Sequence, residues 1–309
     1  MNIIQHLVKI LRRRLVYQNP RGPLLAHAGM IAVFGACTVA FSSLQRGAEA
    51  PGWQAYGTAM GVLLLIGLQL RAGDVCAIAG DDVGWPPGQP LPRGWVAPTK
   101  VRWIWGIAAI VQVVWVLVYD AELLQVLALT GSYLALMSVG FFWRDGLKMR
   151  PVIELLGTVL IVPLMAYFAA ACEWLPRGAT APRGLGWFLA ASFLNGIIIE
   201  IGRKLRQPAD EREDVETYSK LWGKSGGAVV LLAAMLAAVG YAGMAATGIG
   251  WVWPVLMGLG CLWVLAVAVM SGYAFGRLSG KRIEILTLLW VITLNLLLGL
   301  VPLVLRAVS

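Results

Sequence analysis

The carboxylates of this chain gather in two short segments whose spacing suits chemistry on a divalent cation. The first segment holds Asp74, Asp81 and Asp82, and in a continuous helix Asp74 and Asp82 share one face. The second holds Glu200, at the end of an apolar run, and Asp210. Mg²⁺ takes oxygen ligands and bridges to phosphate. The two segments therefore predict a Mg²⁺ and phosphate site, provided that they face the same compartment.

Basic residues flank both segments. Arg71 precedes the first, and Arg203, Lys204 and Arg206 follow Glu200. Guanidinium groups hold phosphate oxygens in a forked geometry, so these residues suit a phosphate ligand. Charges at a helix end can also simply mark the water interface. An acid at the membrane end of an apolar run is costly, however, and this favours a functional role for Glu200.

The composition shows what must position these residues. Hydrophobic residues make up 59% of the 309 positions and charged residues 13%, too few to solvate a soluble protein of this length. The apolar residues form long blocks, and about 20 such residues span a bilayer as a helix. Four dispersed cysteines without a CxxC pair and only two histidines make a zinc site or a disulfide framework improbable. The sequence predicts an all-α, polytopic membrane bundle.

The apolar blocks predict about nine transmembrane helices. Residues 1–20 form a basic, partly amphipathic segment that is expected to lie at the interface, and residues 21–309 form the transmembrane domain. The predicted spans cover residues 22–44, 56–73, 102–119, 123–143, 152–175, 184–202, 226–247, 250–274 and 284–305.

The basic residues orient the predicted bundle. With the N-terminus in the cytoplasm and nine alternating spans, 21 of the 25 lysines and arginines fall inside. The exceptions are Arg46, Arg177, Arg183 and Arg306. Topology thus explains the net charge of +9, and no nucleic-acid partner is expected. The C-terminus is predicted outside, in a multi-pass protein of the cell inner (cytoplasmic) membrane.

Two long loops are predicted on the cytoplasmic side, at about residues 72–100 and 202–225. With Glu200 at the edge of the second, they carry nine of the 16 acidic residues. Long charged loops on an otherwise economical membrane protein are where function is expected. The active side is therefore predicted to face the cytoplasm.

At these two regions the chain resembles the UbiA superfamily of intramembrane prenyltransferases. Residues 200–211 read Glu-Ile-Gly-Arg-Lys-Leu-Arg-Gln-Pro-Ala-Asp-Glu, and residues 215–223 read Val-Glu-Thr-Tyr-Ser-Lys-Leu-Trp-Gly, both similar to the second motif of one bacterial branch. Arg71, Asp74, Asp82 and the Pro-Leu-Pro-Arg-Gly run at 90–94 align with its first motif. Residues 144–151 resemble the family's basic link between helices four and five.

The resemblance implies nine transmembrane helices and Mg²⁺-dependent ionisation of an isoprenyl diphosphate, with transfer of the prenyl group to an acceptor that no residue identifies. It implies metal binding and catalysis by Asp74, Asp82 and Glu200, assisted in metal binding by Asp81 and Asp210. The residues that would bind the diphosphate are Arg71, Arg144, Lys148, Arg203, Lys204, Arg206 and Tyr218.

The first motif departs from the family pattern. Val75 and Ile78 stand where the family has acidic residues, and neither side chain binds Mg²⁺. Two alternatives therefore stay open. The chain could be a membrane-embedded terpene cyclase of the UbiA type, in which the allylic cation closes on itself. It could also be a non-catalytic homologue that binds or moves an isoprenoid lipid.

Overall fold

The structure of the chain is a computed structural model that describes residues 24–80, 98–138, 151–207 and 217–308. Side chains are described for all of these except residues 24–26, 73–80 and 98–102. Within these ranges the regular structure is entirely helical, as the sequence predicts.

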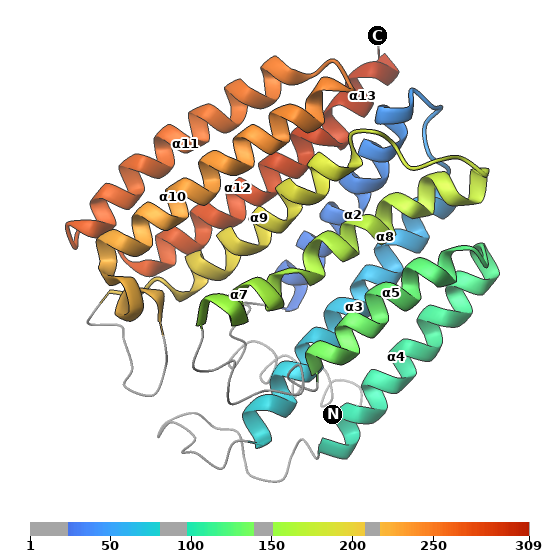
Figure 1. Cartoon of the computed structure of the whole chain (residues 1–309), viewed down its shortest axis with the longest axis horizontal. Helices are drawn as coiled ribbons and strands as arrows, with labels where there is room; N and C mark the ends of the chain where they lie inside the picture. Colours follow the sequence, from blue (N-terminus) through green and yellow to red (C-terminus); the bar gives the residue numbers. More distant parts are fainter. Residues whose placement is uncertain (1–23, 81–97, 139–150, 208–216, 309) are drawn as a thin grey trace, which may run out of the picture.

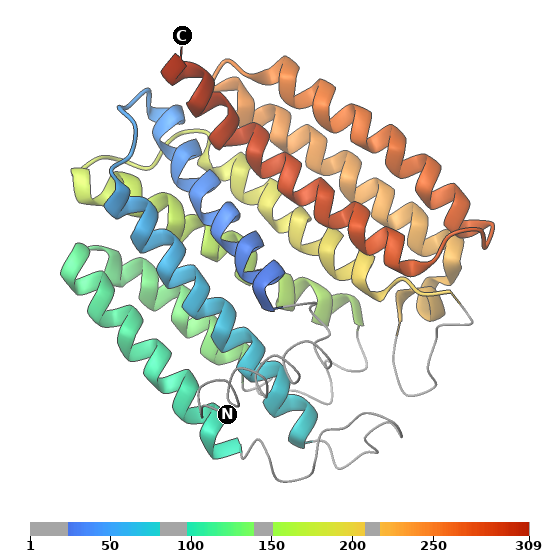
Figure 2. The ribbon, with the colours of Figure 1, turned by 180° about the vertical axis from the view of Figure 1, so that it is seen from behind.

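The helices form one bundle (Figure 1). They are α2 (Leu24–Arg46), α3 (Trp53–Gly80), α4 (Pro98–Tyr119), α5 (Leu123–Ser138), α7 (Pro151–Val159), α8 (Ile161–Trp174), α9 (Leu185–Lys204), α10 (Tyr218–Thr247), α11 (Val252–Ala274), α12 (Gly280–Leu298) and α13 (Leu300–Val308), with the 3-10 turn η2 (Leu175–Arg177) after α8. Successive helical stretches run in opposite directions, with α7 and α8 forming one stretch and α12 and α13 another (Figure 1). Figure 2 shows the bundle from behind, where the same helices lie side by side.

Seven helical stretches of the described chain are long and apolar enough to cross a membrane. Two shorter apolar helices, Trp103–Tyr119 and Leu123–Ser138, complete the set. Each of the nine predicted spans coincides with one of these stretches, and the predicted all-α membrane bundle is confirmed. The number of crossings and the sidedness of the termini stay predictions.

Two predicted spans are each interrupted once. The span at 152–175 breaks at Leu160, between α7 and α8, where Pro163 has no N–H for the carbonyl of Val159. The span at 284–305 breaks at Gly299, between α12 and α13. A Cβ at Gly299 would overlap the backbone of Cys37, so glycine allows α2 to approach this break closely.

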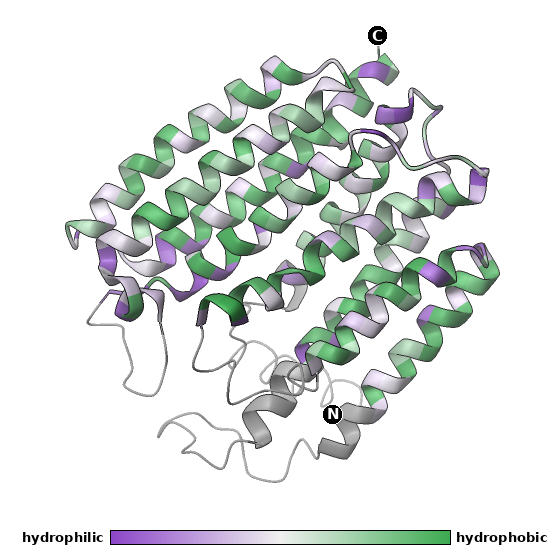
Figure 3. Ribbon diagram, in the orientation of Figure 1, coloured by the Kyte–Doolittle hydropathy of each residue, from purple (hydrophilic) through white to green (hydrophobic). Residues whose placement is uncertain are grey.

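The burial of the helices distinguishes the centre of the bundle from its edge. The central helix α8 packs against α2, α3, α5 and α9. Within the apolar window of α2, 56% of residues are buried, compared with 17% for α11. Figure 3 shows apolar residues along most of each helix and polar residues mainly toward the two ends. The exposed apolar residues along the helices are those expected of a surface that faces lipid.

The two ends of the bundle carry different elements. We call the end formed by the last turns of α3 and α9 and the first turn of α10 the motif end, because both predicted motifs reach it (Figure 1). The far end holds the C-terminus of α2, the turn between α10 and α11, and α13 (Figure 1). The four arginines predicted to lie outside, Arg46, Arg177, Arg183 and Arg306, belong to far-end segments.

Candidate functional site

A carboxylate with two cations occupies the last turn of α9 at the motif end. Arg203 Nη2 donates to both oxygens of Glu200, at 2.8 and 3.0 Å, and Lys204 Nζ lies 3.0 Å from Glu200 Oε1. The side chains of Glu200, Arg203 and Lys204 are 15%, 20% and 36% exposed. The three carry a net positive charge at the end of an apolar helix, so the cluster suits an anionic ligand.

The chain that follows α9 is held in place by the end of α11, the turn after it and the start of α12. The hydroxyl of Tyr273 donates to the Arg206 carbonyl at 2.7 Å. The side-chain amide of Gln207 donates to the carbonyls of Tyr273 and Leu278, at 3.0 and 2.7 Å. A Cβ at Gly280 would overlap the carbonyl oxygen of Leu205. These contacts fix the backbone that carries the second motif.

The start of α10 closes the other side of the second motif. Thr217 caps this helix, and its hydroxyl accepts from the Lys220 N–H at 3.3 Å. The Arg206 N–H donates to the Ser219 hydroxyl at 3.2 Å, which ties the strand-like exit of α9 to the first turn of α10. The two ends of the segment between these helices are therefore joined, although residues 208–216 between them lie outside the described part.

Tyr218 stands beside the charge cluster. Its ring stacks on the ring of Trp222, with centroids 4.8 Å apart, and Lys204 Nζ lies 5.4 Å from the centroid of the Tyr218 ring. The ring thus supports the ammonium group through its negative face. Gly223, at φ 70°, breaks α10 just after this turn, a conformation that glycine adopts without strain.

The first motif begins on α3, which stays helical as far as Gly80. Arg71 is buried on this helix, with 7% of its surface exposed. Asp74, Val75 and Ile78 are within α3, and their side chains lie outside the described set. The helix contains positions 74 and 78, while position 82, the other aspartate of the predicted face, lies outside the described residues.

Several predicted site residues lie outside the described residues and stay predictions. These are Asp81, Asp82, Arg144, Lys148 and Asp210. Of the predicted residues that are described, the structure brings together Glu200, Arg203, Lys204 and Tyr218. Arg206 follows them on the same segment and is held through its backbone.

The described side chains do not by themselves form the predicted metal site. Among them, no group of three or more His, Cys, Asp or Glu residues could hold a metal ion. Glu200 is the one predicted metal ligand in this set, and Arg203 and Lys204 already neutralise its oxygens. By themselves these residues fit an anion better than a bare Mg²⁺, and further carboxylates would be needed for a metal.

A second buried carboxylate, Glu173 on α8 at the far end, is absent from the residues that sequence reasoning selected. Its side chain is fully buried, accepts from the Ser42 hydroxyl at 2.8 Å, and lies 3.3 Å from Arg46 Nη1 and 2.6 Å from Arg177 Nη1. The signal was an acid near the end of an apolar run, the same signal that singled out Glu200.

Comparison with known proteins supports the fold. No family model matches the chain, and no curated protein matches it. Among solved structures, the chain is similar to the apo structure of a UbiA homologue from Aeropyrum pernix K1, with a TM-score of 0.64 and 13% sequence identity. The similarity covers 86% of this chain and 95% of that chain. The chain therefore has the fold of the UbiA superfamily, as the two motifs predict.

Proposed function

We propose that this multi-pass membrane protein, which has the UbiA fold, transfers a prenyl group from an isoprenyl diphosphate to an acceptor. The observation that carries the proposal is the cluster of Arg203 and Lys204 around Glu200, on the segment that resembles the family's second motif. The UbiA fold of the chain supports it. The motif end would face the cytoplasm in the inner (cytoplasmic) membrane.

The cationic residues would hold the leaving group. In this reaction the bond between the allylic carbon and the diphosphate oxygen breaks, and the diphosphate departs with the electron pair. Arg203, Lys204 and Arg206 would bind its oxygens, together with Arg71, Arg144 and Lys148. Positive charge placed in advance where negative charge develops is usually the largest contribution to such catalysis. The acceptor then forms a bond to the allylic carbon and loses a proton.

Glu200 would change partners when the diphosphate binds. In the structure its carboxylate is the counter-ion of Arg203 and Lys204. A diphosphate brings its own negative charge to these cations, which frees the carboxylate to act as a ligand. The phenol of Tyr218 would lie beside the leaving group, since Lys204 is already placed over its ring.

Mg²⁺ is part of the proposal, with Asp74, Asp82 and Glu200 as ligands and Asp81 and Asp210 assisting. A bound Mg²⁺ would supply Lewis-acid stabilisation of the departing diphosphate. This requires the four aspartates to complete the carboxylate set that Glu200 begins. Chelation of divalent cations is therefore expected to abolish turnover.

The test is turnover by the purified protein in mild detergent. Radiolabelled geranyl, farnesyl and geranylgeranyl diphosphates are incubated with Mg²⁺, with and without a lipid extract as the source of acceptor. Diphosphate release that requires the extract supports transfer. Release with a hydrocarbon product and no extract indicates a terpene cyclase. Neither turnover nor Mg²⁺-dependent binding indicates a non-catalytic homologue.

A companion pair of substitutions addresses the departures in the first motif. Val75→Glu and Ile78→Asp restore the acids that the family pattern has at these positions. If the wild-type protein is silent and the double variant turns over substrate, the missing ligands explain the silence. If both are silent, the function lies outside prenyl transfer.

A further inference from the structure

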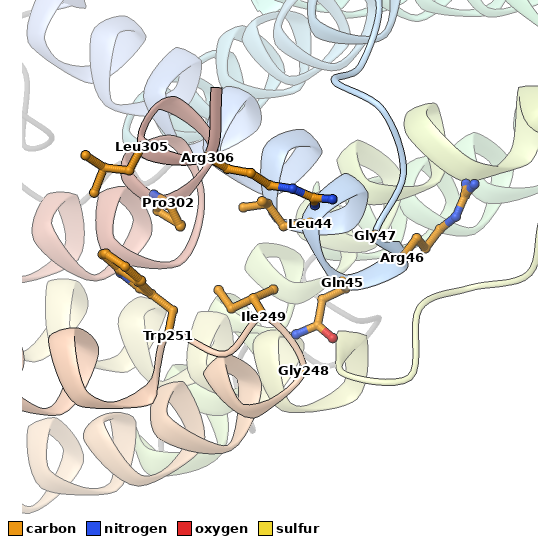
Figure 4. Close-up of a pocket in the computed structure, with 10 residues that line it drawn as sticks. All are labelled: Leu44, Gln45, Arg46, Gly47, Gly248, Ile249, Trp251, Pro302, Leu305 and Arg306. Carbon is orange, nitrogen blue, oxygen red and sulfur yellow. The ribbon is translucent and has the colours of Figure 1, made fainter. Parts of the chain in front are cut away.

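An open pocket of about 830 Å³ lies at the far end of the bundle, away from the motif end. The end of α2, the turn between α10 and α11, and α13 form its walls (Figure 4). Its volume falls in the range of about 300–1,000 Å³ that is typical of small-molecule sites. The proposed prenyl transfer makes no use of this pocket.

The charged residues that line this pocket are basic. Arg46 and Arg306 line the pocket, and an adjoining pocket of about 370 Å³ shares Arg46 and adds Arg183. No aspartate or glutamate lines either one among the residues that the structure describes. Three of the four arginines that depart from the predicted charge asymmetry thus line these two adjoining pockets. This concentration favours an anionic ligand.

Gln45 and Arg46, which line the pocket, are held in place by contacts within the protein. The Gln45 amide donates to the carbonyl of Ala245, and a Cβ at Gly184 or Gly248 would overlap this amide. Arg46 is held on one side by the buried carboxylate of Glu173, at 3.3 Å, and its side chain remains 20% exposed. A preformed site of this kind loses little entropy when it orders a ligand.

The opposite wall is apolar. Figure 4 shows Trp251, Pro302 and Leu305 together on one side of the pocket, while the guanidinium of Arg306 reaches toward Leu44 on α2. The pocket therefore places a cationic region beside an apolar region at the end of a membrane bundle. Basic pockets between transmembrane helices suit lipid head groups, and arginine binds phosphate in a forked geometry.

We propose that this far-end pocket binds the phosphate group of an anionic phospholipid, with the acyl chains along the apolar wall. Arg306 holds the phosphate, and Arg46 and Arg183 attract the remainder of the head group from the adjoining pocket. A free phosphate ion has the same oxygen chemistry but makes no use of the apolar wall. The site is independent of the proposed prenyl transfer, because it lies at the other end of the helices.

The test is lipid binding by the full-length, delipidated protein, measured by native mass spectrometry from a neutral detergent. Phosphatidylglycerol and phosphatidylcholine with identical acyl chains are titrated separately, and inorganic phosphate is added as a competitor. The anionic lipid is expected to bind about tenfold more tightly than the zwitterionic one. Arg306→Gln is expected to weaken phosphatidylglycerol binding by about tenfold, and Arg183→Gln by less.

Arg277→Gln is the matched control, because Arg277 is an exposed arginine in the turn between α11 and α12. It should bind phosphatidylglycerol as the wild type does. Leu305→Glu places an acid in the apolar wall and should exclude the anionic lipid without removing a cation. Equal affinity for the two lipids, or wild-type binding by both Arg306→Gln and Leu305→Glu, overturns the proposal. Displacement of the lipid by millimolar inorganic phosphate would also contradict the proposal, because it would show that the pocket binds a phosphate ion without using the apolar wall.

Discussion

Glu200 at the motif end and Glu173 at the far end have the same kinds of partner and differ in where those partners come from. Both cations beside Glu200 belong to its own helical turn, three and four residues later. Glu173 takes Ser42 and Arg46 from α2 and Arg177 from η2. Its side chain is 0% exposed, whereas that of Glu200 is 15% exposed.

This difference separates a structural ion cluster from one that is available to a ligand. Glu173 links α2 to α8, and its fully buried carboxylate would be a charge without compensation if Arg46 and Arg177 were absent. The ion pairs of Glu200 lie within the last turn of α9, and the three side chains are partly exposed. Residue types alone do not distinguish these two roles. The distribution of the partners over the helices does.

The largest effect is expected for Glu173→Gln. Loss of this carboxylate leaves Arg46 and Arg177 without their buried counter-ion, so the free energy of unfolding should fall by about 3 kcal/mol. Reversible unfolding in mixed detergent micelles measures it. The control is Glu49→Gln, an exposed acid at the same end, expected within about 0.5 kcal/mol of wild type. Wild-type stability of the Glu173 variant would remove the structural role assigned to that cluster.

Glu200→Gln should show the reverse pattern. We expect turnover to fall by about a hundredfold, because the motif end loses a carboxylate that the reaction uses. The free energy of unfolding should change by less than about 1 kcal/mol, since Arg203 and Lys204 can reach water. Assay of turnover and unfolding on the same preparation gives both values. A variant that unfolds easily while its folded fraction keeps full turnover would assign Glu200 to structure.

Lys204→Gln tests whether this cation binds the diphosphate. Binding of geranylgeranyl diphosphate should weaken by about tenfold, because one charge-assisted contact to the phosphate oxygens is lost. Equilibrium binding of the radiolabelled ligand measures the change. Lys281→Gln, an exposed lysine at the start of α12, serves as the control and should bind as wild type does. Equal weakening in both variants would point to net charge in place of a specific contact.

The smallest effect is expected for Thr217→Ala. The substitution removes the cap of α10 and should lower the free energy of unfolding by about 1 kcal/mol. Thr247→Ala, at the other end of the same helix, removes a hydroxyl that only donates to the Met244 carbonyl and should change stability by a few tenths of a kcal/mol. Thermal unfolding of both variants measures the contrast. Equal effects would show that Thr217 does not fix the start of α10.

The spans were predictable because apolar length alone decides them. The residues at which the helices begin and end were not predictable, because polar residues at a helix end have the same hydropathy as loop residues. The helix α10 begins at Tyr218 instead of residue 226, since Thr217 caps a turn that hydropathy does not register. In the same way α3 continues through Asp74 to Gly80, within the range predicted as a loop. The breaks at Leu160 and Gly299 depend on close packing as well as on proline and glycine.

The site was predictable where its geometry is local. Positions 200, 203 and 204 share a helical face, so their ion pairs follow from spacing. The pairing of Glu173 with Arg46 could not be found in this way, because the two residues lie 127 positions apart along the chain. Only the packing of α2 against α8 brings them together.

The contacts that hold the segment after α9 determine which positions tolerate substitution. Tyr273, Leu278 and Gly280 bear no charge and sit far along the chain from the second motif, yet they set where its backbone runs. An alanine at Gly280 would push against the carbonyl of Leu205 and tilt the arginine-bearing turn from behind. We therefore expect Tyr273, Leu278 and Gly280 to tolerate few substitutions, because they position the backbone that carries the charged residues.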